Sequence, residues 1–173
     1  TFKLLESLAE HTAAAVLDRF PLVKRIDLEI EKPWAPIGLP LESVSVEISR
    51  GWHQAFIALG SNMGDKKKYL DDAVKAMDDL DGCRIVTVAD YIETEPYGGV
   101  EQDDFLNSVL LMETRLQPEV LLEKLHEIED LADRKRTIRW GPRTLDLDII
   151  FYDEMIWNSQ TLTLPHPEMH KRS

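Results

Sequence analysis

Two aspartates near the end of the chain are the residues best suited to chemistry on phosphates. Asp146 and Asp148 lie two positions apart within Leu145–Tyr152, a segment predicted to be a strand. Because side chains alternate along a strand, both carboxylates face one side while the apolar neighbours face the other. Two carboxylates on one face repel each other unless a cation lies between them, and Mg²⁺ suits a site that also receives phosphate oxygens. For the pair alone, a solvated strand face is the alternative interpretation.

A group of basic side chains precedes the two aspartates: Arg134, Lys135, Arg136, Arg139 and Arg143. This is a local concentration, because the whole chain has 20 Lys and Arg against 32 Asp and Glu and a formal net charge of -12. That balance disfavours binding to nucleic acid or to an anionic membrane. Guanidinium groups beside a metal can neutralise a polyphosphate, so this group favours the metal interpretation and an anionic partner.

Three shorter motifs are compatible with ligand binding, although each is weak alone. Gly60-Ser61-Asn62-Met63-Gly64-Asp65 follows a predicted strand, but it lacks the ending of a P-loop, and an ordinary strand-to-helix turn also explains it. Near the Thr94 loop, Phe105 could stack on a flat heterocycle while Asn107 reads its polar edge; a turn plus a core Phe is the alternative. His166, between two prolines, either donates to a phosphate or lies at the surface without a role.

The elements that must position these motifs indicate an α+β fold. Residues 51–173 are predicted as one domain with the βαββαβ order of the ferredoxin-like arrangement, which places both helices on one face of an antiparallel sheet. Apolar periodicity predicts the elements. Their ranges, in chain order, are Gln54–Ser61, Lys67–Leu80, Arg84–Glu93, Phe105–Arg115, Pro118–Asp133 and Leu145–Tyr152.

Residues 1–50 are predicted to be a separate segment. A helix ends before Pro21, and two half-buried strands, Val23–Glu31 and Val44–Ile48, flank a proline-rich loop over 32–41. One helix and two strands cannot bury enough apolar surface to be stable alone, so we expect this segment to be incomplete or to pair with other chains. We also expect the chain to stop short of its natural C-terminus.

The composition is that of an ordinary globular protein. Its 173 residues, 43% of them apolar, fit one domain or two small ones. The longest apolar runs are far too short to cross a bilayer and no signal-peptide pattern is seen, so we expect a cytoplasmic location. The single cysteine, Cys83, is expected to be a small buried residue and not a nucleophile.

Taken in order, the motifs strongly resemble those of the 6-hydroxymethyl-7,8-dihydropterin pyrophosphokinase family. The resemblance covers roughly residues 54–173, and its most specific part is the run from Arg139 to Asp148. It implies transfer of the terminal pyrophosphoryl group of ATP to the pterin hydroxymethyl group, with release of AMP, in folate synthesis. Such an in-line displacement at the β-phosphorus depends mainly on positioning and charge neutralisation.

The same resemblance implies roles for individual residues. Asp146 and Asp148 are expected to bind two Mg²⁺ ions that bridge the ATP phosphates. The other residues expected to take part in catalysis are Arg136, Arg139 and Arg143. The residues expected to bind the pterin are Thr94, Tyr97, Phe105, Asn107 and Asp146. Those expected at nucleotide, phosphate or closing-loop positions are His126, Glu129, Arg134, Arg136, Trp140, Arg143, Thr163, His166 and Arg172.

Two departures from the family pattern affect these expectations. Asp133 stands where the family often has glycine, which places a negative charge beside the phosphate path and is expected to stiffen or slow the loop. The family also continues beyond Arg172 with an aromatic residue that forms the second face of the pterin site. It continues there with further structure that completes the domain as well. We therefore expect both the pterin affinity and the stability of this chain to be lower than those of a complete member of the family.

Residues 1–50 resemble the C-terminal half of dihydroneopterin aldolase, a tunnelling-fold enzyme one step earlier in the same pathway. Glu6 matches the glutamate that binds the pterin, and Lys32 matches the catalytic lysine; a first-turn helix acid and a loop cation are the alternatives. With half of the aldolase missing, we expect no lyase activity from this chain, and a bifunctional natural protein. Alternatives to the transferase are aldolase activity from this segment and a non-catalytic pterin- or nucleotide-binding module. Self-assembly of the chain through the aldolase-like segment is a separate expectation.

Overall fold

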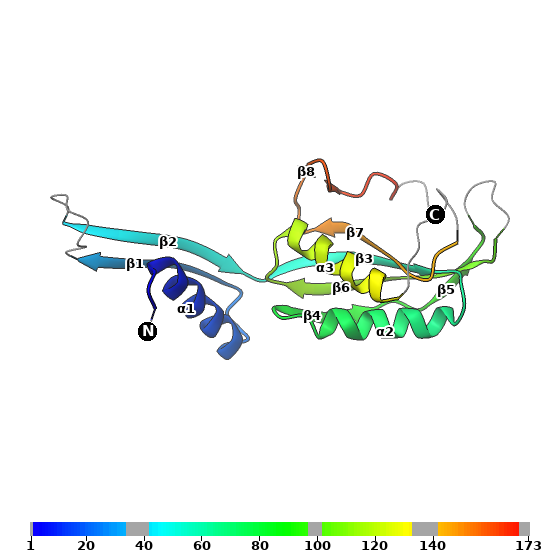
Figure 1. The fold of residues 1–173 in the computed structure, drawn as a ribbon, viewed down its shortest axis with the longest axis horizontal. Helices are drawn as coiled ribbons and strands as arrows, with labels where there is room; N and C mark the ends of the chain where they lie inside the picture. The colour runs from blue at the N-terminus through cyan, green and yellow to red at the C-terminus, as the bar shows by residue number, and fades with distance from the viewer. Residues whose placement is uncertain (1, 34–41, 97–101, 133–141, 170–173) are drawn as a thin grey trace. The chain divides into compact units, whose positions relative to one another are not determined.

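The structure is a computed structural model that describes residues 2–33, 42–96, 102–132 and 142–169. It contains two compact units, Thr1–Trp52 and His53–Ser173 (Figure 1).

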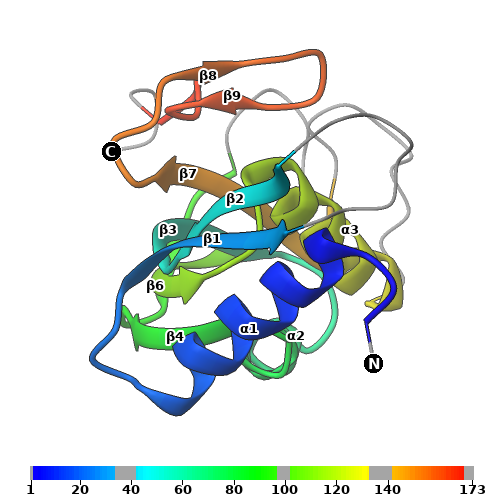
Figure 2. The same ribbon diagram turned by 90° about the vertical axis from the view of Figure 1, so that its left-hand side faces the viewer.

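The first unit is a helix packed on a two-stranded antiparallel sheet. Its elements are α1 (Leu5–Arg19), β1 (Arg25–Pro33) and β2 (Ser43–Gly51). Ala9, Ala13 and Leu17 recur at helical spacing and form the buried side of α1, which runs along both strands (Figure 2). The predicted helix and the two predicted strands are confirmed.

The loop between these strands begins later than the sequence predicts. Lys32 and Pro33 were expected in the loop, but they belong to β1, where they pair with Val44 and Ser43 of β2. The two-stranded ladder continues through both residues because the proline occupies the last position of an edge strand, where its missing N–H costs little. The rest of the predicted loop, residues 34–41, lies outside the described residues.

The second unit combines an antiparallel sheet with two helices on one of its faces. The elements are β3 (His53–Ser61), α2 (Lys66–Asp78), β4 (Cys83–Val88), β5 (Ile92–Thr94), β6 (Phe105–Thr114), α3 (Pro118–Leu131), β7 (Asp146–Tyr152), β8 (Trp157–Asn158) and β9 (Thr163–Leu164). The strands are ordered β4-β6-β3-β7, β5 pairs with β6, and α2 and α3 contact each other and the sheet (Figure 1).

Alternation along the strands decides which side chains meet the helices. Ile57 and Leu59 of β3 are buried. Leu147 of β7, which pairs with Leu59, is buried as well. Phe56 and Val109 alternate with these buried positions and are each 38% exposed. The sheet therefore has a helix-covered face and an opposite face, and the second of these carries the candidate site.

Replacing Leu125 by Ala is expected to lower the free energy of unfolding by about 2–5 kcal/mol, because the truncation leaves a cavity in the core. Leu125 lies on α3 and is fully buried against the sheet. Leu131 ends the same helix and is 87% exposed, so Leu131→Ala is a matched control expected to change stability by about 0.5 kcal/mol or less. Urea denaturation followed by circular dichroism measures both variants, and equal effects would contradict this assignment of the core.

The prediction of one continuous strand over Arg84–Glu93 is wrong. The structure has two strands, β4 and β5, with an interruption around Ala89. The Ala89 N–H still donates to the Val109 carbonyl at 2.9 Å, but the Ala89 carbonyl accepts from the Ser108 hydroxyl at 2.9 Å. A side chain thus takes the place of a backbone partner, and the ladder stops there.

Tyr91 fastens the interrupted segment to α2. Its hydroxyl donates to Asp71 Oδ1 at 2.7 Å, and Lys67 Nζ donates to Asp71 Oδ2 at 2.6 Å. Burial, followed by the hydrogen bond to the Asp71 carboxylate, raises the pKa of Tyr91 to about 12. The two hydrogen bonds lower the pKa of Asp71.

A short hairpin, β8–β9, follows β7 and leads to His166 (Figure 2). The His166 N–H donates to the Ile150 carbonyl at 3.0 Å, which holds the segment after the hairpin against the sheet. The hairpin is not predictable from periodicity because each of its strands has two residues.

Cys83 is buried, as predicted, and its Sγ lies 3.1 Å from the Thr114 hydroxyl. Burial raises the pKa of its thiol, which disfavours the nucleophilic thiolate. Among the helices of the described residues, none has the length and apolar character needed to span a membrane.

Candidate active site

Asp146 and Asp148 point away from the helices, on the opposite face of the sheet. Leu147 and Ile149 alternate with them and are each 1% exposed on the helix side, as the sequence predicts. The Asp146 side chain is 9% exposed, whereas the Asp148 side chain is 38% exposed. Two carboxylates on one strand face, one deep and one open to solvent, are a donor set that a substrate could reach.

Arg143 supplies a cation directly beside the deeper carboxylate. Its Nη1 donates to Asp146 Oδ2, forming an ion pair. Arg143 lies in the segment immediately before β7, so the strand that presents the aspartates also holds a guanidinium next to them. The four other basic residues of the group expected from the sequence lie outside the described residues: Arg134, Lys135, Arg136 and Arg139.

His166 lies near the more exposed carboxylate. Its Nε2 is 4.0 Å from Asp148 Oδ1, and the Glu168 N–H donates to its Nδ1 at 3.2 Å. Because Nδ1 accepts that hydrogen bond, the proton of a neutral ring belongs on Nε2, which faces the carboxylate. His166 is therefore an oriented side chain at the edge of the site.

A second group, expected from the sequence to hold a flat ring, lies on the same face. Asn107 Nδ2 donates to the Thr94 hydroxyl at 2.7 Å, which leaves Asn107 Oδ1 pointing over Gly60. A Cβ at Gly60 would lie 2.7 Å from Asn107 Oδ1 and 3.7 Å from the Phe105 ring. A side chain at Gly60 would collide with the Asn107 amide, so the glycine leaves room for that amide.

Gly60 connects the two halves of the site. It pairs with Asn107 of β6 on one side and with Asp146 of β7 on the other. Since directly opposed residues of an antiparallel sheet share a face, the amide, the bare glycine and the carboxylate form one row across three neighbouring strands. A ring held over Phe105 and Asn107 would have its edge toward the aspartates.

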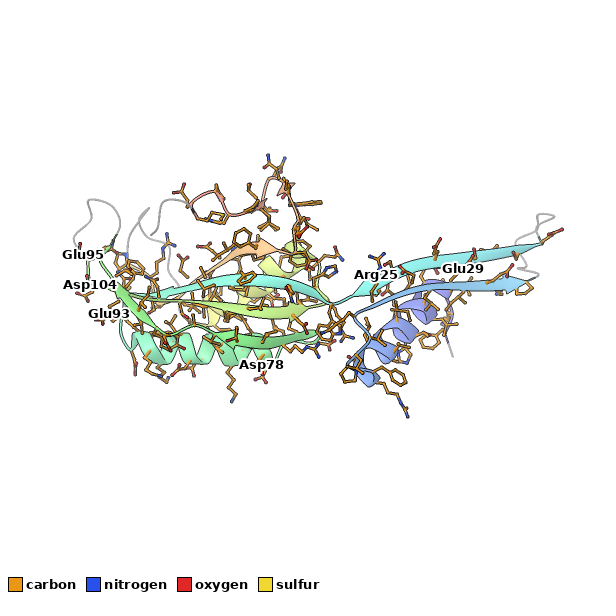
Figure 3. All side chains as sticks on the ribbon, turned by 180° about the vertical axis from the view of Figure 1, so that it is seen from behind. Arg25, Glu29, Asp78, Glu93, Glu95 and Asp104 are labelled. Carbon is orange, nitrogen blue, oxygen red and sulfur yellow. The ribbon has the colours of Figure 1, made fainter. Side chains whose placement is uncertain are left out.

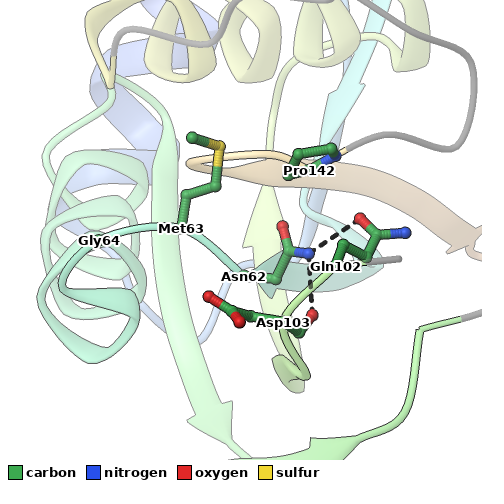
Figure 4. Close-up of a pocket in the computed structure, with 6 residues that line it drawn as sticks. All are labelled: Asn62, Met63, Gly64, Gln102, Asp103 and Pro142. Carbon is green, nitrogen blue, oxygen red and sulfur yellow. Dashed lines mark hydrogen bonds between the residues drawn. The ribbon is translucent and has the colours of Figure 1, made fainter. Parts of the chain in front are cut away.

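Asn62, directly after β3, holds two loops beside this row. Its side-chain Nδ2 donates to Gln102 Oε1 and to the Asp103 carbonyl, each at 3.0 Å (Figure 4). Its Oδ1 accepts from the Arg143 N–H at 2.8 Å. These loops border a hollow of about 310 Å³, lined by Asn62, Met63, Gly64, Gln102, Asp103 and Pro142. The sequence places Asn62 only in a possible turn. The feature that could have identified it as a functional residue is a polar amide immediately after an apolar strand.

Carboxylates also gather where β5 ends and β6 begins. Figure 3 shows Glu93, Glu95 and Asp104 at this end of the sheet. Lys66 Nζ donates to the Asp104 carbonyl at 3.1 Å and lies 3.7 Å from Glu93 Oε1. This end is acidic, so a polyphosphate is expected to approach from the Arg143 side.

With this geometry described, similarity to known proteins identifies the family. Residues 56–173 match the family described as 7,8-dihydro-6-hydroxymethylpterin-pyrophosphokinase. The chain belongs to this pyrophosphokinase family. Residues 1–49 match dihydroneopterin aldolase, so both resemblances seen in the sequence are confirmed.

Relatives of the pyrophosphokinase segment include single-function and bifunctional proteins. The chain is 42% identical over 118 residues to the 2-amino-4-hydroxy-6-hydroxymethyldihydropteridine pyrophosphokinase of Haemophilus influenzae, covering 68% of this chain and 74% of that protein. It is 41% identical over 118 residues to the enzyme of the same name from Bacillus subtilis, covering 68% and 71%. It is 42% identical over 117 residues to the bifunctional protein FolKE of Lactococcus lactis, covering 68% of this chain but only 34% of that protein.

The other described residues expected at the nucleotide site lie on α3 and β9. His126 is exposed on α3, whereas Glu129 on the same helix is 2% exposed and Thr163 is exposed on β9. The expected residues that lie outside the described ones are Tyr97, Arg134, Arg136, Arg139, Trp140 and Arg172. Within the described ranges, no group of three or more His, Cys, Asp or Glu side chains is arranged to hold a metal ion.

Glu129 has a role in the structure that the sequence does not reveal. Its Oε1 accepts the backbone N–H of Leu147 at 2.7 Å, from the helix side of β7. Leu147 lies between Asp146 and Asp148, so this bond fixes the stretch of strand that presents both carboxylates.

Replacing Glu129 by Ala is expected to lower the free energy of unfolding by about 1–3 kcal/mol, because the Leu147 N–H loses its buried acceptor. Glu129→Gln keeps an oxygen at the same place and is the matched control, expected to lose less than half as much. Thermal and urea unfolding of both variants measure the difference. If the Gln variant were as unstable as the Ala variant, the bond to Leu147 would not explain the burial of this carboxylate.

The two aldolase-like residues are both exposed in the first unit. Glu6 lies in the first turn of α1, and Lys32 lies near the end of β1. Their positions are compatible with the alternative interpretations, an acid in the first turn of a helix and an exposed cation.

Proposed function

We propose that residues 53–173 transfer the pyrophosphoryl group of ATP to the hydroxymethyl group of 6-hydroxymethyl-7,8-dihydropterin and release AMP. The observation that carries this proposal is the row Asn107, Gly60 and Asp146, which lies on one face of three neighbouring strands. The names of the Haemophilus and Bacillus relatives support the same reaction class. The substrates are assigned here by membership of the family.

The pterin would lie against Phe105 and Asn107, on the face of the sheet that they share with Gly60. Phe105 offers a ring face for stacking, and Asn107 Oδ1 offers an acceptor to the amino and ring N–H groups of the pterin. The hydrogen bond from Asn107 Nδ2 to Thr94 fixes which end of the amide faces the ligand. This arrangement directs the hydroxymethyl group toward β7.

The ATP phosphates would lie against β7. Asp146 and Asp148 present acceptor oxygens on one face, and Mg²⁺ needs only one or two protein carboxylates when phosphate and water oxygens complete its octahedron. Two Mg²⁺ ions held there would neutralise phosphate charge. Arg143 adds a guanidinium at the deeper carboxylate, and His166 at the edge is oriented to donate from Nε2.

The chemical step needs little from the protein beyond alignment. The hydroxymethyl oxygen forms a bond to the β-phosphorus, while the bond from that phosphorus to the oxygen shared with the α-phosphate breaks and AMP leaves. The residues of the site hold the two reactants in line and offset the developing negative charge.

The proposal includes two specific folds, a ferredoxin-like arrangement for the second unit and a tunnelling fold for the first. The strand order β4-β6-β3-β7, with every pairing antiparallel, fits the ferredoxin-like arrangement that the sequence predicts. We propose the tunnelling fold for the first unit on the strength of its aldolase match alone.

The test is to incubate the purified chain with ATP, Mg²⁺ and the hydroxymethyl pterin and to separate the nucleotides. AMP that forms only when the pterin is present supports the transferase. ADP as the product, or AMP that forms equally without pterin, contradicts it. ATP binding without any turnover would favour the non-catalytic binding module; the same assay on a chain extended at its C-terminus then separates an incomplete site from a wrong assignment.

Aldolase activity is the second candidate, because residues 1–49 match that family. Release of glycolaldehyde from dihydroneopterin, and its loss in Lys32→Ala, would support this alternative. We propose that the segment instead provides a surface for self-assembly, since both strands of its two-stranded sheet have an edge without a strand partner among the described residues. Sedimentation of the chain measures this directly.

A further inference from the structure

We propose that Asn62 is a positioning residue that couples the pterin half of the site to the phosphate half. This inference rests on the proposed function for its meaning. Nothing in the family match or in the names of the relatives assigns a role to this residue. It is 2% exposed, so its contacts are made entirely inside the protein.

The side chain of Asn62 connects two segments that are distant in sequence. On one side it donates two hydrogen bonds, to Gln102 Oε1 and to the Asp103 carbonyl. On the other side its Oδ1 accepts the Arg143 N–H, and its own backbone N–H donates to the Arg143 carbonyl at 3.1 Å. Figure 4 shows the two donated bonds diverging from one amide nitrogen.

Asparagine is the residue that this geometry requires. The amide offers two N–H donors at one end and an acceptor at the other, and all three are used. Aspartate keeps the acceptor for Arg143 but places an oxygen against the Asp103 carbonyl. Leucine has a similar size but removes all three bonds, and each buried partner left without a hydrogen bond is costly.

Each end of this connection continues into one half of the site. Asp103 lies two residues before Phe105, where β6 begins. Arg143 pairs through its side chain with Asp146. A shift at Asn62 would therefore move the ring-stacking group relative to the carboxylate.

A displacement between two reactants lowers the chemical rate more than it lowers the affinity for either reactant, because near-attack geometry is lost. The proposal thus predicts a specific pattern for Asn62→Asp. The single-turnover rate of AMP formation falls by about 10- to 100-fold, the loss expected for a displacement of about 1 Å. The dissociation constants of ATP with Mg²⁺ and of the pterin, measured separately, change by less than about 3-fold, since no group that contacts either one is removed.

Gln160→Glu is the matched control, because it makes the same change from amide to carboxylate at an exposed position between β8 and β9. It is expected to keep the wild-type rate. The proposal is overturned if Asn62→Asp retains the wild-type rate, or if its rate falls only as far as the folded fraction or one dissociation constant accounts for.

A structural measurement keeps the inference testable even if the wild-type chain makes no AMP. Hydrogen exchange, measured by segment, is expected to rise in Asn62→Asp both around Asp103 and around Arg143, because one buried amide holds both. Exchange that rises in only one of these segments, or equally throughout the unit, contradicts the coupling. If Asn62→Asp does not fold, Gln102→Ala removes a single bond from the same amide and is expected to raise exchange at both segments by a smaller factor. If Asn62→Asp raises exchange in both segments although neither the wild-type chain nor a chain extended at its C-terminus makes AMP, the proposed function is refuted and the coupling stands.

Discussion

Replacing Asp148 by Ala is expected to lower pterin-dependent AMP formation by about 10²- to 10³-fold, the loss typical of removing one group that stabilises transition-state charge. The fold is expected to survive, because the Asp148 side chain is 38% exposed and its apolar neighbours form the core. Initial rates of AMP formation, measured alongside thermal unfolding, test both parts of this expectation.

A surface carboxylate provides the control for the Asp148 variant. Asp72 lies on α2, on the helix-covered side of the sheet; its side chain is 66% exposed and its Oδ2 lies 3.6 Å from Lys68 Nζ. Asp72→Ala therefore removes the same charge on the side of the sheet opposite the proposed site and is expected to keep the wild-type rate. Full activity of Asp148→Ala would show that this carboxylate holds no metal. A parallel loss in both variants would point to net charge as the cause.

Replacing Gly60 by Ala is expected to weaken pterin binding by about 10-fold or more, the effect of losing one buried polar contact in a site built around it. The new Cβ would lie 2.7 Å from Asn107 Oδ1, so the amide must turn away or break its bond to Thr94. The atom that must move is the end of a flexible side chain. The loss is therefore expected in affinity, with a change of about 1 kcal/mol or less in stability.

Titration of the pterin and of ATP with Mg²⁺ against the Gly60→Ala variant separates the two halves of the site. ATP affinity is the internal control and is expected to stay within about 3-fold of wild type, because the displaced atom is Asn107 Oδ1, which the proposed function places against the pterin. If the variant bound the pterin normally, the Asn107 amide beside Gly60 would not contact the pterin. If it lost ATP and pterin affinity equally, the effect would be a general distortion of β3.

Local patterns in the sequence predict the strands and the face of the aspartates. Asp146 and Asp148 alternate with Leu147 and Ile149, and the side of the strand that each one takes follows from a period of two residues. The same reasoning predicts α2 and α3 to within a few residues, because their apolar positions recur at helical spacing. These features depend on neighbours in sequence, which is why they are visible without a structure.

Features that depend on distant residues are not predictable in the same way. The role inferred for Asn62 depends on its hydrogen bonds to Gln102 and Arg143, which lie 40 and 81 positions later in the sequence. Glu129 bonds to a backbone N–H on another element, and nothing in the spacing of α3 distinguishes it from a surface acid. Periodicity also fails at Ala89, because a serine hydroxyl from the neighbouring strand interrupts the ladder.

The measurement that tests the central claim most directly follows the phosphorus atoms of ATP. The chain is incubated with Mg²⁺, the hydroxymethyl pterin, and ATP labelled at either the α- or the β-phosphorus, and the products are separated. We predict that the β label moves to the pterin while the α label stays in AMP. A β label that remains in ADP, or that appears in free pyrophosphate beside an unmodified pterin, would contradict the transfer of the pyrophosphoryl group across this face of the sheet.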